Sequence, residues 1–364
     1  MTLVESLSTP ALLLDLDVLE ANLRRMAEHT NALGVTLRPH IKTHKCVEIG
    51  RLQRDYGAKG ITVSTLHEAR VFADHGFDDV TWAMPIALSR LDEASELATR
   101  IRLRVVVDSS RAIDALDRTG HPFHVWLKVD SGYHRCGVDP HAAVAVELAH
   151  RIAGARHLSF DGILTHSGHA YQGRSRDEIA AIAAAERRVM VDLAERIRGE
   201  GIPAAGVSLG STPAMAVVDA LEGVTEVRPG NYAFYDYQQV VLRSCTVHDC
   251  ALTVLASVIS SQPGGNHCVI DAGALALSKE PGPPDAPRPT MGEIFRDYGA
   301  RTLRPEARVV TVSQEHGIVT APLPVGELVR ILPNHACLTA ACFDEYHVVR
   351  GDEVVDRWRI WRGR

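Results

Sequence analysis

The sequence has little of what would mark a membrane, secreted or nucleic-acid-binding protein. Aromatic residues make up 5% of the 364 residues, and the net charge of −6 is spread along the chain rather than gathered in tails. A nucleic-acid binder needs a basic face, which this balance does not supply. The longest uncharged stretches, such as residues 251–269, contain Ser, Gln, Pro and Gly and predict no membrane span. We therefore expect neither a nucleic-acid partner nor a membrane partner.

Cysteine pairs and glycine-rich nucleotide loops are also missing. The seven cysteines form no Cys-x-x-Cys pair, and this odd number in a long chain indicates reduced thiols in the cytoplasm. The first ten residues contain a glutamate and no apolar signal core, which agrees with a cytoplasmic location. No Gly-x-Gly-x-x-Gly follows a strand-like run, so a Rossmann dinucleotide site has little support. Histidine, in contrast, is abundant, with 18 residues.

The first part of the chain alternates strand-like and helix-like segments. Stretches long enough for crossover helices, such as residues 89–100 and 176–198, separate short β-branched runs. Such alternation predicts a parallel sheet, and eight repeats favour a (β/α)8 barrel over an open doubly wound sheet. The eight runs are Val35–Arg38, Gly60–Val63, Asp79–Ala83, Arg104–Val107, Phe123–Val129, Leu158–Thr165, Gly206–Leu209 and Thr225–Arg228.

After about Tyr237 the pattern changes to strand-like runs with no convincing helical period between them. This predicts a mainly β domain after the barrel, and we place the boundary so that the barrel covers residues 15–237 and the β domain residues 238–364. Residues 278–292 carry five prolines and are predicted to form an extended, exposed loop. The runs are Ala251–Ser260, His267–Asp271, Arg308–Val312, Glu327–Leu332, Tyr346–Val349 and Val354–Trp361.

Polar residues follow the predicted barrel strands, at the face where barrel enzymes carry their catalytic groups. Pro39 keeps Arg38 extended, so we expect the first strand to continue and to place His40, Lys42 and His44 on one face at the barrel mouth. A lysine desolvated near other cations has a lowered pKa and attacks carbonyl groups, as a Schiff base requires. A solvated basic loop is the alternative interpretation. Other polar residues at strand ends are Lys128, Asp130, Arg135, His166, His169 and Tyr171.

Two glycine-containing turns follow the seventh and eighth predicted strands. Gly210–Ser211–Thr212 and Pro229–Gly230–Asn231 can each present backbone N–H groups to an anion. Barrels often bind phosphate around these two strands. Each turn taken alone is better explained as a turn with a helix N-cap, and it is the two together, at neighbouring strand ends, that favour a phosphate site. A phosphate site opposite Lys42 indicates pyridoxal 5′-phosphate.

A candidate metal site lies in the predicted β domain, at Pro333–Cys337. Residues two apart in an extended segment share a face, so His335 and Cys337 can converge on one ion. An imidazole and a thiolate suit zinc, and a site with only two local protein ligands would be open, as in catalytic sites. A chance His-x-Cys is the alternative. The pairs Cys245/Cys250 and Cys337/Cys342 lack the spacing of a zinc knuckle and are interpreted as ordinary thiols.

Taken together, these motifs resemble one enzyme family. The segments Thr-Pro-Ala-Leu-Leu-Leu-Asp, Arg-Pro-His-Ile-Lys-Thr-His-Lys, His-Ser-Gly-His-Ala-Tyr, Gly-Ser-Thr-Pro, Arg-Pro-Gly-Asn-Tyr and Pro-Asn-His-Ala-Cys occur here in the order of that family. It is the group of metal-activated pyridoxal-phosphate enzymes that contains D-serine dehydratase, D-threo-3-hydroxyaspartate dehydratase and D-threonine aldolase. The resemblance covers nearly the whole chain. It implies the alanine racemase fold (fold type III), with residues 1–14 joining the β domain.

The resemblance also implies roles for individual residues. Lys42 would form the Schiff base and act as catalytic base, and Tyr171 would lie near the pyridine nitrogen. Ser211, Thr212, Gly230 and Asn231 would hold the phosphate. His335 and Cys337 would bind the divalent ion, with zinc expected and manganese or magnesium as alternatives.

We expect a dehydratase that converts a D-β-hydroxy amino acid, such as D-serine or D-threo-3-hydroxyaspartate, into a 2-keto acid and ammonia. Dehydratases similar to this chain tend to carry His-x-Cys at the metal, whereas the aldolases tend to carry His-x-Asp. An aldolase that yields glycine and an aldehyde is the alternative, with His169 or His316 as its base. A non-catalytic pyridoxal-phosphate carrier is a third interpretation. Arg135 and Arg243 are candidates to meet an additional substrate carboxylate, and related enzymes suggest a homodimer.

Overall fold

The computed structural model describes residues 2–203 and 206–363. The chain divides into two compact units. The first, called here the barrel unit, comprises Met26–Lys42 and Gly50–Gly230. The second, the β-unit, comprises the segment up to Arg25 together with Thr43–Ile49 and Asn231–Arg362. The domain boundaries predicted from the sequence, residues 15–237 and 238–364, stay a prediction.

Among its described residues, the barrel unit contains eight parallel strands in the order β3-β10-β9-β8-β7-β6-β5-β4. The two ends of this sheet meet where His40 bridges Thr62, whose N–H donates to the carbonyl of Pro39 at 2.8 Å. Every strand-like run predicted for the barrel is therefore confirmed. The strands are β3 (Thr36–Leu37), β4 (Ile61–Val63), β5 (Asp79–Pro85), β6 (Arg102–Val107), β7 (Phe123–Lys128), β8 (Leu158–Leu164), β9 (Gly206–Leu209) and β10 (Glu226–Val227).

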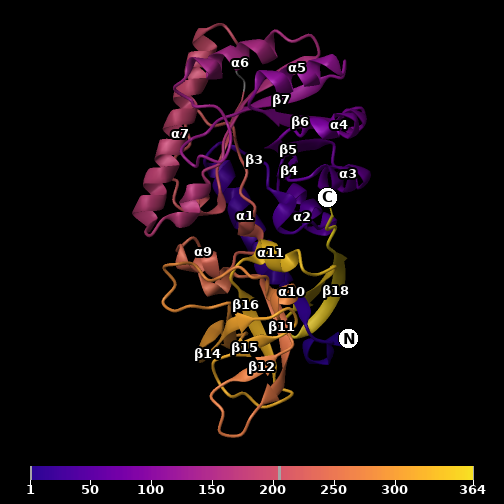
Figure 1. The fold of residues 1–364 in the computed structure, drawn as a ribbon, viewed down its shortest axis with the longest axis vertical. Coiled ribbons are helices and arrows are strands. Elements are labelled where there is room, and N and C mark those ends of the chain that lie inside the picture. The colour runs from indigo at the N-terminus through magenta and orange to yellow at the C-terminus, as the bar shows by residue number, and fades with distance from the viewer. Residues whose placement is uncertain (1, 204–205, 364) are drawn as a thin grey trace. The chain divides into compact units, whose positions relative to one another are not determined.

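Helices connect these strands and cover the sheet (Figure 1). Three of them begin at the Ser or Thr residues that favour N-caps: Thr65, Ser109 and Ser175 each accept the N–H of the residue three positions on. Each cap satisfies an amide that a helix start would otherwise leave unpaired. The helices of this unit are α3 (Leu66–Asp74), α4 (Leu91–Ala98), α5 (Ser110–Arg118), α6 (Ala143–Ala153), α7 (Arg176–Gly199) and α8 (Thr212–Met215), while α1 (Leu16–Ala32) and α2 (Val47–Asp55) contribute residues to both units.

The β-unit contains a ten-stranded sheet. Strands β11, β12, β15, β14, β13 and β16 pair in that order, and β16 returns to pair with β11, so these six form a closed barrel. Strand β2 joins the sheet between β11 and β17. The strands are β1 (Thr2–Leu3), β2 (Ala11–Asp15), β11 (Leu252–Ser261), β12 (Cys268–Ile270), β13 (Gly292–Asp297), β14 (Thr302–Val312), β15 (Gly317–Val319), β16 (Leu328–Pro333), β17 (Glu345–Arg350) and β18 (Glu353–Arg359).

The sequence missed part of the β-unit. It did not predict β13 or β15, nor the short helices α9 (Tyr237–Val241), α10 (Ala274–Leu277) and α11 (Ala336–Ala340). Helices of four or five residues are too short to show a helical period, which is why the expectation of no helix here was wrong. The proline-rich segment is a loop as predicted, but it is tied down: the side-chain amide of Asn334 donates to the carbonyls of Glu280 and Thr290.

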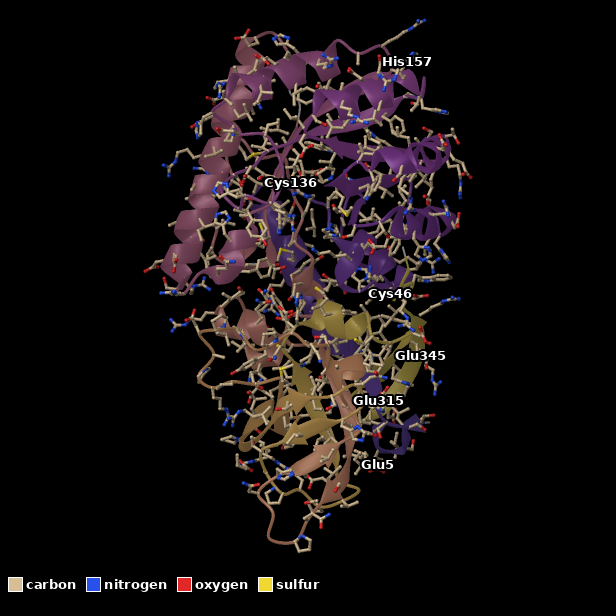
Figure 2. The ribbon with its side chains drawn as sticks, viewed as in Figure 1. Glu5, Cys46, Cys136, His157, Glu315 and Glu345 are labelled. Atoms are coloured by element: carbon tan, nitrogen blue, oxygen red, sulfur yellow. The ribbon has the colours of Figure 1, made fainter. Side chains whose placement is uncertain are left out.

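Free thiols and a small apolar cluster complete the description of the core. All seven cysteines carry free thiols, including the buried Cys46 and the half-buried Cys136 labelled in Figure 2.

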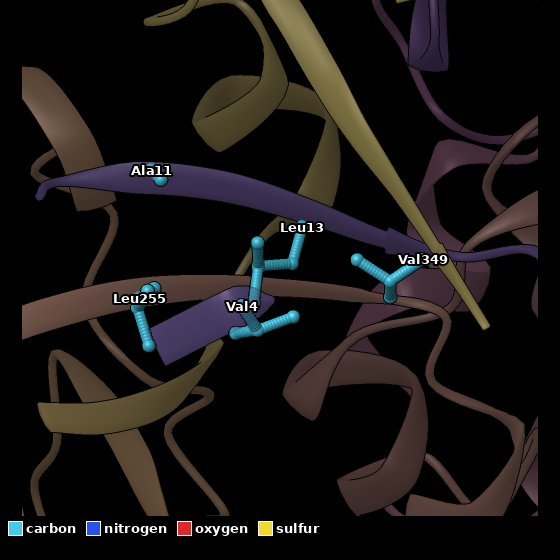
Figure 3. Close-up of a cluster of buried hydrophobic side chains, with 5 residues drawn as sticks. All are labelled: Val4, Ala11, Leu13, Leu255 and Val349. Atoms are coloured by element: carbon cyan, nitrogen blue, oxygen red, sulfur yellow. The ribbon is translucent and has the colours of Figure 1, made fainter. Parts of the chain in front are cut away.

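In the β-unit, side chains from β2, β11, β17 and the segment after β1 pack together in a cluster formed by Val4, Ala11, Leu13, Leu255 and Val349 (Figure 3). Leu13 and Val349 are fully buried, so strand β2 is a core strand of this sheet. No helix within residues 2–203 and 206–363 has the length and hydrophobicity needed to cross a bilayer.

Candidate active site

Lys42 lies in a single turn of 3-10 helix, Ile41–Thr43, which follows the bridge at His40. This turn corrects the sequence expectation, because it ends the strand alternation that was to place His40, Lys42 and His44 on one face. The Lys42 side chain is exposed rather than desolvated. The structure therefore shows Lys42 as an accessible amine after β3.

The buried lysine of this unit is Lys128, the last residue of β7. Burial, reinforced by the positive charge of Arg228, lowers the pKa of Lys128 to about 8, although Cys136 opposes the shift. Arg228 is buried after β10 and donates hydrogen bonds to the Ser208 hydroxyl and the Thr165 carbonyl. Its own pKa is lowered to about 10 by burial. Two cations thus share one buried site at the carboxyl ends of the strands.

His166 follows β8 and is held neutral. Burial, and then the charges of Lys42 and Arg135, keep the pKa of this imidazole well below its usual range. The Tyr133 ring contacts the edge of His166 with ring centres 6.0 Å apart. Tyr133 also stacks on His169 at 6.2 Å and lies beneath the Arg135 guanidinium at 5.3 Å. Proton transfer through His166 would therefore begin from the neutral imidazole.

Helix α7 brings one carboxyl group, Glu186, into this cationic cluster. Burial raises the pKa of Glu186, while Ser167, Arg228 and Lys128 oppose the shift. Sequence reasoning did not find Glu186. The signal was present, since this glutamate falls on the buried stripe of α7 that also contains Ala183 and Met190.

The phosphate candidates also lie in the barrel unit, apart from Asn231. Ser211 is the N-cap of α8 but makes no capping bond, and its buried hydroxyl has no hydrogen-bond partner among the described residues. Thr212, the first residue of α8, and Gly230 are both buried. A buried hydroxyl that has no hydrogen-bond partner and lies beside the start of a helix fits an anion such as phosphate. Tyr171 is half-buried in the 3-10 helix Gly168–Gln172.

Asn231 lies in the β-unit and has a different environment. Its side-chain amide donates to Asp236 at 2.6 Å and lies 3.8 Å from the sulfur of Cys337. The buried side chain is thus turned toward the residues predicted to bind metal.

His335 and Cys337 are brought together by the start of a helix. His335 is the extended N-cap of α11, and Cys337 lies in the first turn of that helix, so the expectation of one continuous extended segment was wrong. Burial opposes a charge on His335, yet the thiolate of Cys337 and then Asp236 raise the pKa of this imidazole to about 9. The two side chains therefore lie close enough to interact, and a metal ion bound by both would replace the proton of the imidazole.

This pair fits a metal ion. The Nδ1 atom of His335 is buried and has no hydrogen-bond partner among the described residues. A thiolate and an imidazole are the donors that zinc prefers. The described ranges contain no cluster of three or more His, Cys, Asp or Glu residues suited to a metal.

Most of the chain matches two known protein domains. Residues 14–238 match the alanine racemase N-terminal domain, and residues 251–349 match a putative serine dehydratase domain. The chain is 37% identical to D-threo-3-hydroxyaspartate dehydratase from Delftia sp. (strain HT23), with 98% of each chain covered. The chain belongs to the family that contains D-threo-3-hydroxyaspartate dehydratase and D-serine dehydratase. It is also 34% identical to D-serine dehydratase from Dictyostelium discoideum, covering 97% of this chain and 96% of that protein.

Relatives named aldolases belong to the same group. The chain is 32% identical to D-threonine aldolase from Arthrobacter sp., over 97% of this chain and 92% of that protein. The predicted resemblance, the alanine racemase-like fold and the relation to carbon–oxygen lyases are confirmed.

A solved structure of the Delftia dehydratase has the same fold, with a TM-score of 0.95, 35% identity and complete coverage of both chains. Two variants of that enzyme have also been solved: a histidine-to-alanine variant, and a cysteine-to-alanine variant in a metal-free form. The two substituted positions are two residues apart, which is the spacing of His335 and Cys337.

Proposed function

We propose that this chain is a pyridoxal-phosphate- and divalent-metal-dependent dehydratase acting on a D-β-hydroxy amino acid such as D-serine or D-threo-3-hydroxyaspartate. The observation that carries the proposal is the pair formed by His335 and Cys337, in which a buried imidazole nitrogen with no hydrogen-bond partner among the described residues belongs to a side chain that interacts with the Cys337 thiol. An open thiolate–imidazole pair leaves coordination positions for a substrate hydroxyl. The relatives with 37% and 34% identity are both named dehydratases.

Two sets of residues would hold the two groups. Lys42, Tyr171, Ser211, Thr212, Gly230 and Asn231 would hold pyridoxal phosphate, whose ring withdraws electrons from the substrate Cα. His335 and Cys337 would hold the metal, which makes the β-hydroxyl a better leaving group. Zinc is favoured over manganese or magnesium because a thiolate is a soft ligand.

The chain's own residues would then move the protons. The amine of Lys42 removes the proton from Cα, and its exposure lets it reach a substrate. His166 stays neutral, because burial and the surrounding cations lower its pKa, so it adds no charge to the cluster. Lys128 and Arg228 supply positive charge for anionic groups. The Cα–H and Cβ–O bonds break, water leaves, and hydrolysis of the resulting enamine gives a 2-keto acid and ammonia.

The runner-up is an aldolase that uses the same two groups. His169 would be its candidate base, since it stacks on Tyr133 and its pKa is lowered by burial. His316 is exposed in the turn between β14 and β15. One product assay with D-threo-3-hydroxyaspartate separates the readings: the proposal predicts oxaloacetate and ammonia, whereas glycine and glyoxylate would contradict it. No turnover of any D-β-hydroxy amino acid would favour a carrier.

We propose a cytoplasmic homodimer that binds a small D-amino acid, with neither nucleic acid nor membrane as a partner. The seven free thiols support a reducing compartment. Light scattering of the purified protein would report twice the chain mass, and a monomer would contradict the dimer.

A further inference from the structure

Asp236 is a buried carboxylate of the β-unit that no predicted role uses. It is the N-cap of α9, and its Oδ1 atom accepts the N–H of Gln239 at 3.0 Å, an ordinary capping bond. Its other oxygen, Oδ2, does not serve this helix. Oδ2 accepts the N–H of Ala336 at 2.9 Å and the side-chain amide of Asn231 at 2.6 Å.

Both donors to Oδ2 adjoin the proposed metal ligands. Ala336 is the residue between His335 and Cys337, so the bond to Oδ2 fixes the peptide that separates the two ligands. The amide nitrogen of Asn231 also lies 3.8 Å from the sulfur of Cys337. One carboxylate oxygen therefore restrains the backbone of the pair and orients an amide against its sulfur.

We propose that Asp236 is a positioning residue for the His335–Cys337 pair, acting through the Ala336 peptide and the Asn231 amide; this inference rests on the proposed function, in which that pair holds the metal. The physical reason is that buried polar groups need partners. Ala336 N–H and the Asn231 amide both lie in buried surroundings, so they hold their places only while Oδ2 accepts them. Residues that orient metal ligands in this way change metal affinity by about 10–100-fold when they are replaced.

The sharpest variant is Asp236→Asn in the full-length, cofactor-loaded protein. Asparagine is an equally good N-cap, so its side-chain oxygen can still accept the N–H of Gln239. Its NH2 group then faces the N–H of Ala336, which loses its acceptor. We expect the zinc dissociation constant, measured by competition with a chromophoric chelator, to rise by about 10–100-fold. The thiolate-to-metal absorption of the Co²⁺-loaded protein should also shift.

A control and a second variant keep this test decisive. Asp249→Asn is the matched control, because Asp249 also helps to cap a short helix of the β-unit, as the third helical residue of a capping box, but accepts from Thr246 and Arg25 instead. It should leave the zinc affinity and the Co²⁺ spectrum unchanged. If thermal unfolding shows that Asp236→Asn does not fold, Asp236→Ser decides, because serine can cap α9 but is too short to reach Ala336.

Failure of the inference and failure of the proposed function look different. If both Asp236 variants bind zinc as tightly as the unaltered protein and give the same Co²⁺ spectrum, while Cys337→Ala weakens binding, Asp236 does not position the pair. If the unaltered protein binds zinc no more tightly than Cys337→Ala, the metal site itself is wrong.

Discussion

The two units contain buried polar clusters of opposite character, and two histidines show the difference. In the barrel unit His166 faces Lys42, Arg135, Lys128 and Arg228, and its pKa lies well below the usual value. In the β-unit His335 faces Cys337 and Asp236, and its pKa rises to about 9. A cluster rich in cations is suited to phosphate and carboxylate groups, and a cluster rich in anions is suited to a metal ion. The same side chain thus marks two different binding chemistries.

Removing the amine of Lys42, in the barrel unit, should have the largest effect on turnover. We expect Lys42→Ala to lower turnover by about 10⁴-fold, the upper end of what a general base contributes. Borohydride reduction followed by peptide mapping should find the cofactor attached at Lys42 in the unaltered protein and nowhere in the variant. The exposed Lys59 offers a matched control, since Lys59→Ala should retain both activity and adduct. An adduct at Lys45 or Lys128 would show that this lysine, and not Lys42, binds the cofactor.

Removing the thiolate of Cys337 should stop the reaction while the cofactor stays bound. We expect Cys337→Ala to lower dehydration by about 10²–10³-fold, because a metal ion contributes several kcal/mol to the transition state. The cofactor absorbance should persist. Cys342→Ala is the control, since that thiol lies just after α11 and donates to the backbone carbonyls of Ala274 and Leu338. Equal losses in the two variants would show that the effect is structural.

The cationic cluster also predicts a pH dependence of stability in the cofactor-free protein. Burial in the folded protein disfavours the charged form of Lys128 and lowers its pKa from 10.5 to about 8. Between pH 8 and 10.5 the folded protein loses this proton while the unfolded chain keeps it, and the free energy of unfolding therefore rises. The expected gain, relative to Lys128→Met, is about 3 kcal/mol.

Denaturant unfolding of both proteins across this pH range measures that gain. Lys59→Met serves as the exposed counterpart and should follow the unaltered protein at every pH. A stability difference between the unaltered protein and Lys128→Met that stays constant with pH would mean that Lys128 keeps an ordinary pKa.

The smallest effect concerns the packing of Tyr133 above the cationic cluster. A Cβ atom at Gly168 would lie 2.4 Å from the Tyr133 ring, so Gly168→Ala must displace that ring. We expect a destabilisation of about 1–3 kcal/mol in thermal or denaturant unfolding, as for other overpacked sites. Gly199→Ala, at the end of α7, meets nothing within 4 Å and should be neutral or stabilising. Unchanged stability of Gly168→Ala would show that the ring is loosely held.

Local patterns predicted the barrel strands, because each strand alternates with a helix whose apolar stripe is visible in the sequence. The turn at Lys42 was not predictable in this way. The chain that follows it is fixed by residues far along the sequence: the Tyr346 hydroxyl donates to the carbonyl of His44, and the Trp361 N–H donates to that of Lys45. Motif spacing found His335 and Cys337 but not the helix that starts between them. Asp236, about a hundred residues earlier, joins this group only through tertiary contacts.

The most direct test of the account removes the metal while following the product and the cofactor together. Protein treated with a chelator should keep its cofactor absorbance and lose the production of 2-keto acid and ammonia, and added zinc should restore it. This result is expected because the residues proposed to hold the cofactor, apart from Asn231, lie in the barrel unit, whereas the proposed metal ligands His335 and Cys337 lie in the β-unit. Full turnover after chelation, or loss of the cofactor together with the metal, would contradict the account.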